Sequence, residues 1–261
     1  MSLQHFFLED QVLSAEVTDT FFVRLSDDDA KHARVLRLGV GEHIAIVDAV
    51  KDYFECEITS FDAGGLMVRI AGKLEPTRGI PRVVLVQGLA KGDKMDTIIR
   101  HATELGVFGF VPLICERSIV KLDSKKAAAK TDRWRSIAKS AAMQSGQLSL
   151  PEVALPQTID GVIALLSQVT ALLICWEQAS SVENLHAALA KALKQTATLP
   201  ADACVAVVVG PEGGLSSAEV DAFLSGNDRA ALVSLGPSIL RTETAGIVAP
   251  ALVLYELGGL Q

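Results

Sequence analysis

The apolar and polar positions of this chain follow two different rhythms. In the first seventy residues they form short runs, which predict strands at Phe21–Leu25, His43–Val47, Tyr53–Thr59 and Leu66–Ala71. A short helix rich in polar residues is predicted between the first two strands, over Asp27–Leu38. Short strands at this spacing are typical of a small barrel or sandwich.

After Pro81, apolar runs alternate with segments of helical spacing. Strands are predicted at Arg82–Gln87, Phe108–Ile114, Ala171–Trp176, Cys204–Val209 and Ala231–Leu235. Helices are predicted at Lys91–Leu105, Asp123–Met143, Val182–Leu193 and Thr242–Leu257. A further helix is predicted to begin at the capping box formed by Ser216 and Glu219. This alternation indicates a mainly parallel sheet covered on both faces. We expect an α/β protein with a small β domain at 1–72, a linker at 73–81 and an α/β domain at 82–261.

Composition and charge narrow the class of protein. The apolar content of 49% is ample for a core, and no apolar stretch is long enough to span a membrane. Four scattered cysteines form no metal-ligand spacing, which favours reduced thiols in a cytoplasmic protein without a metal site. The net charge of −7 argues against a nucleic-acid partner, but residues 116–139 carry eight Lys/Arg against three Asp/Glu. Such a segment is either a local surface for an anionic ligand or a solvated helix face.

Two glycine-containing turns stand out near the C-terminus. Gly210–Gly214 reads GPEGG, and Leu235–Ala245 reads LGPSILRTETA. Each follows an apolar strand and precedes a helix, so both turns should lie at the edge where open α/β sheets bind ligands. Neither run matches a dinucleotide fingerprint or a phosphate-binding P-loop. The pattern therefore predicts a small-molecule pocket built largely from backbone.

Taken together, these runs resemble those of the SPOUT class of S-adenosylmethionine-dependent RNA methyltransferases, and more narrowly the RsmE family. The resemblance covers nearly the whole chain. Its other motifs are His5-Phe6-Phe7, His32 to Arg37 with Gly41, Lys91 to Met95, Thr103 to Val107, Glu116-Arg117-Ser118 and Gln144-Ser145-Gly146. The resemblance implies methylation of N3 of a uridine in small-subunit (16S) ribosomal RNA. It also implies a PUA-like RNA-binding β-barrel, an α/β domain with a trefoil knot, and a homodimer.

The resemblance also assigns roles to residues. Cofactor binding is expected at Glu177, Gly210, Pro211, Glu212, Gly213, Gly214, Leu235, Gly236, Ser238, Ile239, Leu240, Thr242 and Thr244. Arg241 is the candidate for stabilising charge on the uracil, with Glu243 or a water as proton acceptor. RNA contacts are expected at His32, Arg34, Arg37, Lys91, Lys94 and Arg117.

Four positions depart from the family pattern: His101 replaces the usual Lys, Met143 replaces Glu, and Gln147 and Ser238 each replace Arg. Three of them reduce positive charge near the expected RNA surface. Two alternative functions stay open on the sequence: ribose 2′-O-methylation of another RNA, and a non-catalytic RNA-binding role in ribosome assembly.

Overall fold

The computed structural model describes residues 3–62, 65–74, 80–176 and 183–260. It divides into two compact units. The first consists of residues 1–78 together with 142–150, and the second of residues 79–141 and 151–261. The division falls within the segment predicted as a linker (73–81), whose residues 75–79 lie outside the described part. The short segment 142–150 belongs to the first unit, although the sequence analysis predicted two contiguous domains.

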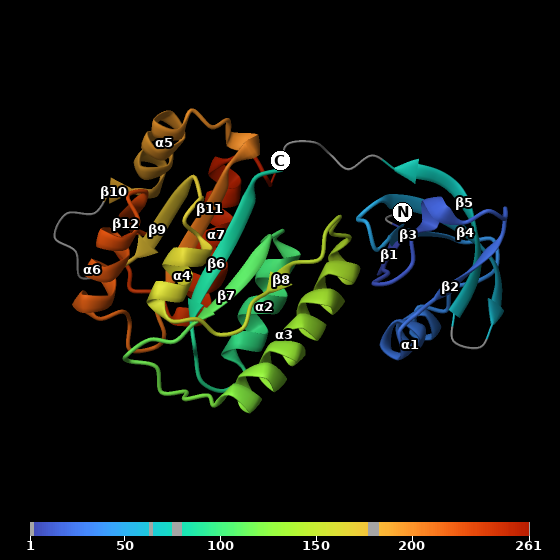
Figure 1. The fold of residues 1–261 in the computed structure, drawn as a ribbon, viewed down its shortest axis with the longest axis horizontal. Helices are drawn as coiled ribbons and strands as arrows, with labels where there is room; N and C mark the ends of the chain where they lie inside the picture. The colour runs from blue at the N-terminus through green and yellow to red at the C-terminus, as the bar shows by residue number, and fades with distance from the viewer. Residues whose placement is uncertain (1–2, 63–64, 75–79, 177–182, 261) are drawn as a thin grey trace. The chain divides into compact units, whose positions relative to one another are not determined.

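The first unit is built on a five-stranded sheet in the order β1-β3-β4-β5-β2 (Figure 1). Its elements are β1 (Gln4–Phe7), a 3-10 turn at Leu13–Ala15, β2 (Phe21–Arg24), α1 (Asp27–Val35), β3 (His43–Val47), β4 (Tyr53–Asp62) and β5 (Gly65–Leu74). Strands β1 and β3 are parallel, and the other pairs are antiparallel. The four predicted strands are all present, and β1 is an additional strand that the sequence analysis missed.

Alternating side chains of these strands form the core of the first unit. Ile44 and Ile46 of β3 and Ile58 of β4 are fully buried together with Phe6 of β1. Met143, from the segment that joins this unit, belongs to the same core. The family position where Met143 replaces a Glu is therefore an apolar core position in this chain.

The second unit is built on a seven-stranded sheet in the order β10-β12-β9-β11-β6-β7-β8, and every neighbouring pair is parallel. Its strands are β6 (Arg82–Gly88), β7 (Gly109–Leu113), β8 (Glu152–Val153), β9 (Ala171–Cys175), β10 (Glu183–Asn184), β11 (Cys204–Val209) and β12 (Ala230–Ser234). Its helices are α2 (Lys94–Glu104), α3 (Ser124–Ser145, whose last residues join the first unit), α4 (Ile159–Leu165), α5 (Leu185–Thr196), α6 (Ser217–Gly226) and α7 (Thr242–Glu256), with a 3-10 turn at Pro200–Asp202.

Both faces of this sheet are covered, as the strand–helix alternation predicts. Successive residues of a strand point to opposite faces, so Val205 and Val207 of β11 join one core while Ala206 and Val208 join the other. The first core is completed by α2, α3, α5 and α7, and the second by α4 and α6 (Figure 1). The uninterrupted apolar runs in the sequence are the signature of strands buried on both sides.

The register of the sheet aligns the ends of three strands. Val209 at the end of β11 pairs with Cys175 of β9, and Cys175 pairs with Val233 of β12. The turns after these strands therefore start at the same level of one sheet edge. Strands β11 and β12 are not neighbours, because β9 lies between them.

The described residues contain no helix with the length and apolar character needed to cross a membrane.

Candidate functional site

A pocket of about 330 Å³ lies where β9, β11 and β12 end. The segments that follow these strands form most of its wall, and Lys94 of α2 and the first turn of α7 complete it. Ten of the residues predicted to bind the cofactor line it: Gly210, Pro211, Glu212, Gly214, Leu235, Gly236, Ser238, Ile239, Leu240 and Thr242. The structure thus brings most of the predicted cofactor-binding residues into one cavity. The contacts of these residues with a ligand stay predictions.

Three predicted cofactor residues stand apart from this lining. Gly213 and Thr244 are described by the structure but are not part of the pocket wall. Glu177 lies outside the described residues.

The glycines of both turns are required by the local geometry. A side chain at Gly210 would place its Cβ 2.9 Å from the carbonyl carbon of Gly214 and from the nitrogen of Leu215. Gly214 and Gly236 have φ angles of +67° and +118°, which side-chain-bearing residues rarely adopt. The turns can therefore fold tightly.

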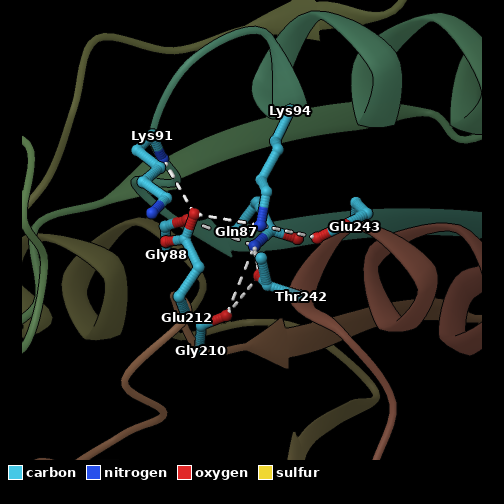
Figure 2. Close-up of polar contacts among 8 residues, drawn as sticks. All are labelled: Gln87, Gly88, Lys91, Lys94, Gly210, Glu212, Thr242 and Glu243. Atoms are coloured by element: carbon cyan, nitrogen blue, oxygen red, sulfur yellow. Dashed lines mark hydrogen bonds and ion pairs between the residues drawn. The ribbon is translucent and has the colours of Figure 1, made fainter.

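A buried hydrogen-bond network joins the end of β6 to both turns (Figure 2). Gln87 is 1% exposed, and its Nε2 donates to Thr242 Oγ1 at 2.9 Å and to Gly88 O at 3.1 Å. The hydroxyl of Thr242 in turn donates to Gly210 O at 2.7 Å. Thr242 begins α7 and Gly210 begins the turn after β11, so this network fixes the relative positions of the two segments.

Lys94 forms a second connection above this network (Figure 2). Its ammonium lies 3.2 Å from Glu212 Oε1 and 3.0 Å from Glu243 Oε2. The backbone N–H of Lys91 also donates to Glu212 Oε1, at 3.1 Å. Lys94 was predicted to contact RNA, but the structure places it in the pocket wall between two carboxylates.

These contacts shift the ionisation of all three side chains. The hydrogen bond to Glu243 raises the pKa of Lys94 despite some desolvation. Burial raises the pKa of Glu212, but hydrogen bonds from backbone N–H groups and from Lys94 outweigh it and leave that pKa lowered. The pKa of Glu243 is lowered by a hydrogen bond from its own backbone N–H and by Lys94. All three groups are therefore charged at neutral pH.

Arg241 is the N-cap residue of α7 and lines the pocket with an exposed side chain. Its positive charge also contributes to lowering the pKa of Glu243. Ile239, two residues earlier, is 83% exposed. The rim of the pocket thus carries one cation and an apolar side chain that a bound molecule would cover.

Arg117 is attached to the turn after β11 rather than free. Its Nη1 donates to Gly213 O and Leu215 O, both at 3.2 Å. The carboxylate of Glu219 accepts hydrogen bonds from the backbone N–H groups of Glu116 and Ser216, each at 2.7 Å. These bonds hold the segment after β7 against the Gly210–Gly214 turn.

The remaining predicted RNA contacts lie on exposed surfaces. Lys91 precedes α2 in the second unit, and Arg34 and Arg37 lie in and just after α1 of the first unit, all three with exposed side chains. His32 lies in α1, and its side chain is outside the described part. His32, Arg34 and Arg37 belong to the other unit, and their contact with RNA stays a prediction.

Sequence reasoning missed several residues of the pocket wall. Cys175, Trp176, Val209, Leu215, Val233, Ser234 and Ala245 line it as well. Most of them are the last residues of the three strands or immediate neighbours of the predicted turns, so the strand ends themselves were the available signal. Lys94 had no such signal, because only the tertiary fold brings α2 to this edge.

Models of known families match most of this chain. Residues 78–254 match the model of the RNA methyltransferase domain, and residues 25–70 match that of the RNA methyltransferase PUA domain. The chain is thus an RNA methyltransferase domain preceded by a PUA domain.

Individual relatives define the family more narrowly. The chain is 33% identical over 258 residues to the Ribosomal RNA small subunit methyltransferase E of Bacillus subtilis, covering 97% of each chain. The protein of that name from Mycobacterium bovis is 31% identical, with 88% of this chain and 86% of the relative covered. The chain belongs to the ribosomal RNA small subunit methyltransferase E family.

Solved structures agree over nearly the full length. The Neisseria gonorrhoeae member, whose structure is bound to S-adenosyl methionine, has 25% identity and a TM-score of 0.75 over 97% of both chains. A Legionella pneumophila protein solved with the bound cofactor SAM has 27% identity and a TM-score of 0.78 over 98% of both chains. The two-unit architecture is therefore that of the family.

Proposed function

We propose that this protein transfers the methyl group of S-adenosylmethionine to N3 of a uridine in small-subunit ribosomal RNA. The observation that carries the proposal is the pocket at the aligned ends of β9, β11 and β12, lined by the two predicted turns. It is supported by the relatives' names and by the cofactor in the Neisseria and Legionella structures.

The residues of the pocket fit this cofactor. The volume of the pocket, about 330 Å³, is at the lower end of the range for small-molecule sites. Backbone of the glycine-containing turns can hydrogen-bond an adenine, and Leu235, Ile239 and Leu240 supply apolar surface for its ring. Glu212 offers a carboxylate for the ammonium group at the amino-acid end of the molecule.

Arg241 is the side chain placed to assist the reaction. When bound, S-adenosylmethionine supplies an electrophilic methyl group on a sulfonium sulfur. Loss of the N3 proton leaves negative charge on O2 and O4 of the uracil, and the Arg241 guanidinium at the pocket rim stabilises that charge. Its position as the N-cap residue of α7, in the wall of the pocket, supports this role.

Of the two candidate proton acceptors, Glu243 and a water molecule, this proposal takes the water. The carboxylate of Glu243 is ion-paired with Lys94 at 3.0 Å, and its pKa is lowered by its own backbone N–H and by Lys94. A carboxylate engaged by an ammonium in this way is less available to take the N3 proton. Glu243 therefore contributes charge and position rather than proton abstraction.

The RNA is positioned by cations that take no part in the methyl transfer itself. Lys91 and Arg117 are the candidates in the second unit, and Arg34 and Arg37 are those in the first. Contacts of this kind go to phosphates and carry no sequence information, so they orient the RNA without choosing the uridine.

A homodimer and a trefoil knot are part of the proposal, together with a cytoplasmic location where ribosomal subunits are made. Helix α7 supports the dimer because it is apolar on all sides, and such a helix is normally covered. Val253 and Leu254 face the core, whereas Leu252 and Tyr255 are exposed. Light scattering coupled to size-exclusion chromatography should give twice the chain mass of 27.7 kDa.

The experiment that tests the activity uses small ribosomal subunits from a strain that lacks the gene for this protein. The subunits are incubated with the purified protein and labelled S-adenosylmethionine, and the digested RNA is analysed by nucleoside mass spectrometry. We expect 3-methyluridine with the wild-type protein. Arg241→Ala should lower the rate on the order of 100-fold while the cofactor still binds. Label on a ribose, or no label in any fraction despite cofactor binding, would contradict the proposal.

A further inference from the structure

Lys94 lies between two carboxylates, and its surroundings differ from those of Lys91. Its side chain is 25% exposed, and those of its partners Glu212 and Glu243 are 19% and 24% exposed. Lys91, one turn earlier, is exposed and uses only its backbone N–H in this cluster. The two lysines were predicted to act alike, but their surroundings differ.

The cluster joins three separate segments of the second unit. Lys94 starts α2, Glu212 lies in the turn after β11, and Glu243 lies in the first turn of α7 (Figure 2). The carboxylate of Glu212 has a second partner, because the backbone N–H of Lys91 donates to its Oε1 at 3.1 Å. The ammonium therefore lies between two carboxylates that belong to different segments.

Removing this ammonium would act directly on the pocket. Two carboxylates that both contact one nitrogen would then face each other without a cation between them, and like charges at this separation repel. Glu212 is two residues from Gly210, and Glu243 follows Thr242. Gly210 and Thr242 both line the pocket and are hydrogen-bonded to each other, so the repulsion would pull on this bond from both sides.

The ammonium also has little capacity left for RNA. It already lies within ion-pair distance of two carboxylates, 3.2 Å from Glu212 and 3.0 Å from Glu243. A phosphate at this position would have to approach two ionised carboxylates. The exposed ammonium of Lys91 has neither restriction.

We propose that Lys94 is a positioning residue of the cofactor pocket, holding α2, the Gly210–Gly214 turn and the start of α7 together, and that it does not contact RNA phosphates. This inference rests on the proposed function for the identity of the ligand. It changes the role of Lys94 from the RNA surface to the cofactor site, and leaves Lys91 as the phosphate contact at the start of α2.

The test compares Lys94→Met and Lys94→Arg with Lys91→Ala as the matched control. S-adenosylmethionine affinity is measured by calorimetry without RNA, and RNA affinity is measured over a range of salt concentrations. We expect Lys94→Met to weaken cofactor binding on the order of tenfold. Lys94→Arg should recover most of the affinity, because it keeps the charge. The salt slope of RNA binding should stay at the wild-type value in both.

Lys91→Ala should give the opposite result. Its cofactor affinity should equal that of the wild type, because the backbone N–H that bonds Glu212 is retained. Its salt slope should fall by about 0.7 to 0.9, the change expected for one lost phosphate contact. If Lys94→Met behaves in this way instead, with unchanged cofactor affinity, Lys94 is a phosphate contact and the inference is wrong.

The double variant Lys94→Met/Glu243→Gln separates positioning from general damage to the fold. It removes one of the two facing carboxylates, so we expect it to bind the cofactor more tightly than Lys94→Met alone and to fold even if the single variant does not. A double variant that binds the cofactor no better than Lys94→Met would contradict the electrostatic explanation. Failure of the wild-type protein to bind S-adenosylmethionine would refute the proposed function instead.

Discussion

Replacing Thr242 with valine tests whether the buried hydrogen bonds beneath the pocket hold its two turns together. Valine keeps the shape of the side chain and removes only the hydroxyl. In the wild-type protein this hydroxyl accepts from Gln87 Nε2 at 2.9 Å and donates to Gly210 O at 2.7 Å. Thr242 is 7% exposed, so water cannot fully replace these partners.

The expected loss follows from counting these bonds. Each is worth about 1 kcal/mol net, so Thr242→Val should lower the free energy of unfolding by about 2 kcal/mol. The loss of unfolding free energy does not rise much further, because Gln87 Nε2 keeps its hydrogen bond to Gly88 O and is not left without an acceptor. For a unit of this size the melting temperature should fall by about 4 to 8 °C.

The assay is thermal and urea unfolding of the wild type, Thr242→Val and Thr242→Ser. Serine keeps the hydroxyl and loses one methyl group, which costs about 0.8 kcal/mol. We therefore expect valine to be the more destabilising substitution, although it is the more apolar one. Cofactor affinity should fall in the same order, because Gly210 and Thr242 both line the pocket. A serine variant that is less stable than the valine variant would refute this reasoning.

Three further predictions concern other parts of the chain. Asp48→Ala should destabilise the first unit by about 3 kcal/mol in urea unfolding, because its buried carboxylate accepts three backbone N–H bonds. Glu219→Gln should cost about 1 to 3 kcal/mol in the same assay, because the new amide turns a donor towards one of two backbone N–H groups. Burial raises the pKa of the Cys56, Cys115 and Cys175 thiols to about 12, so a thiol reagent at pH 8 should label them only after unfolding. Above the ordinary thiol pKa of about 8.5, the thiols ionise in the unfolded chain but stay protonated in the folded one. The urea midpoint of unfolding should therefore fall as the pH rises above that value.

Local patterns were sufficient to predict most of the elements. The alternation of apolar runs and helical segments after residue 81 predicted the parallel sheet, and the capping box at Ser216 and Glu219 is present with both of its hydrogen bonds. Strand β1 (Gln4–Phe7) was missed because four residues are too few for a period to be recognised. Helix α4 was missed because Gly161 weakens its first turn, which the Thr158 side chain caps instead.

The site was predicted only as far as it is made of contiguous turns. The two glycine-containing runs identified one wall of the pocket, since their conformation depends on local sequence. The ion pairs of Lys94 and the bond from Gln87 to Thr242 join residues that are far apart in the chain, so no local pattern could predict them. The second role of Glu219, as acceptor for the backbone of Glu116, is hidden for the same reason.

The strand order of the second unit has a consequence for synthesis of the chain on the ribosome. Strand β6 pairs with β7 on one side and with β11 on the other. β7 follows within a few tens of residues, but β11 is made roughly 120 residues after β6, a delay of about 6 to 24 s at ordinary translation rates. During that interval one edge of an apolar strand has no partner, and exposed strand edges promote aggregation. The nascent chain should therefore depend on chaperones at this stage more than its finished fold would indicate.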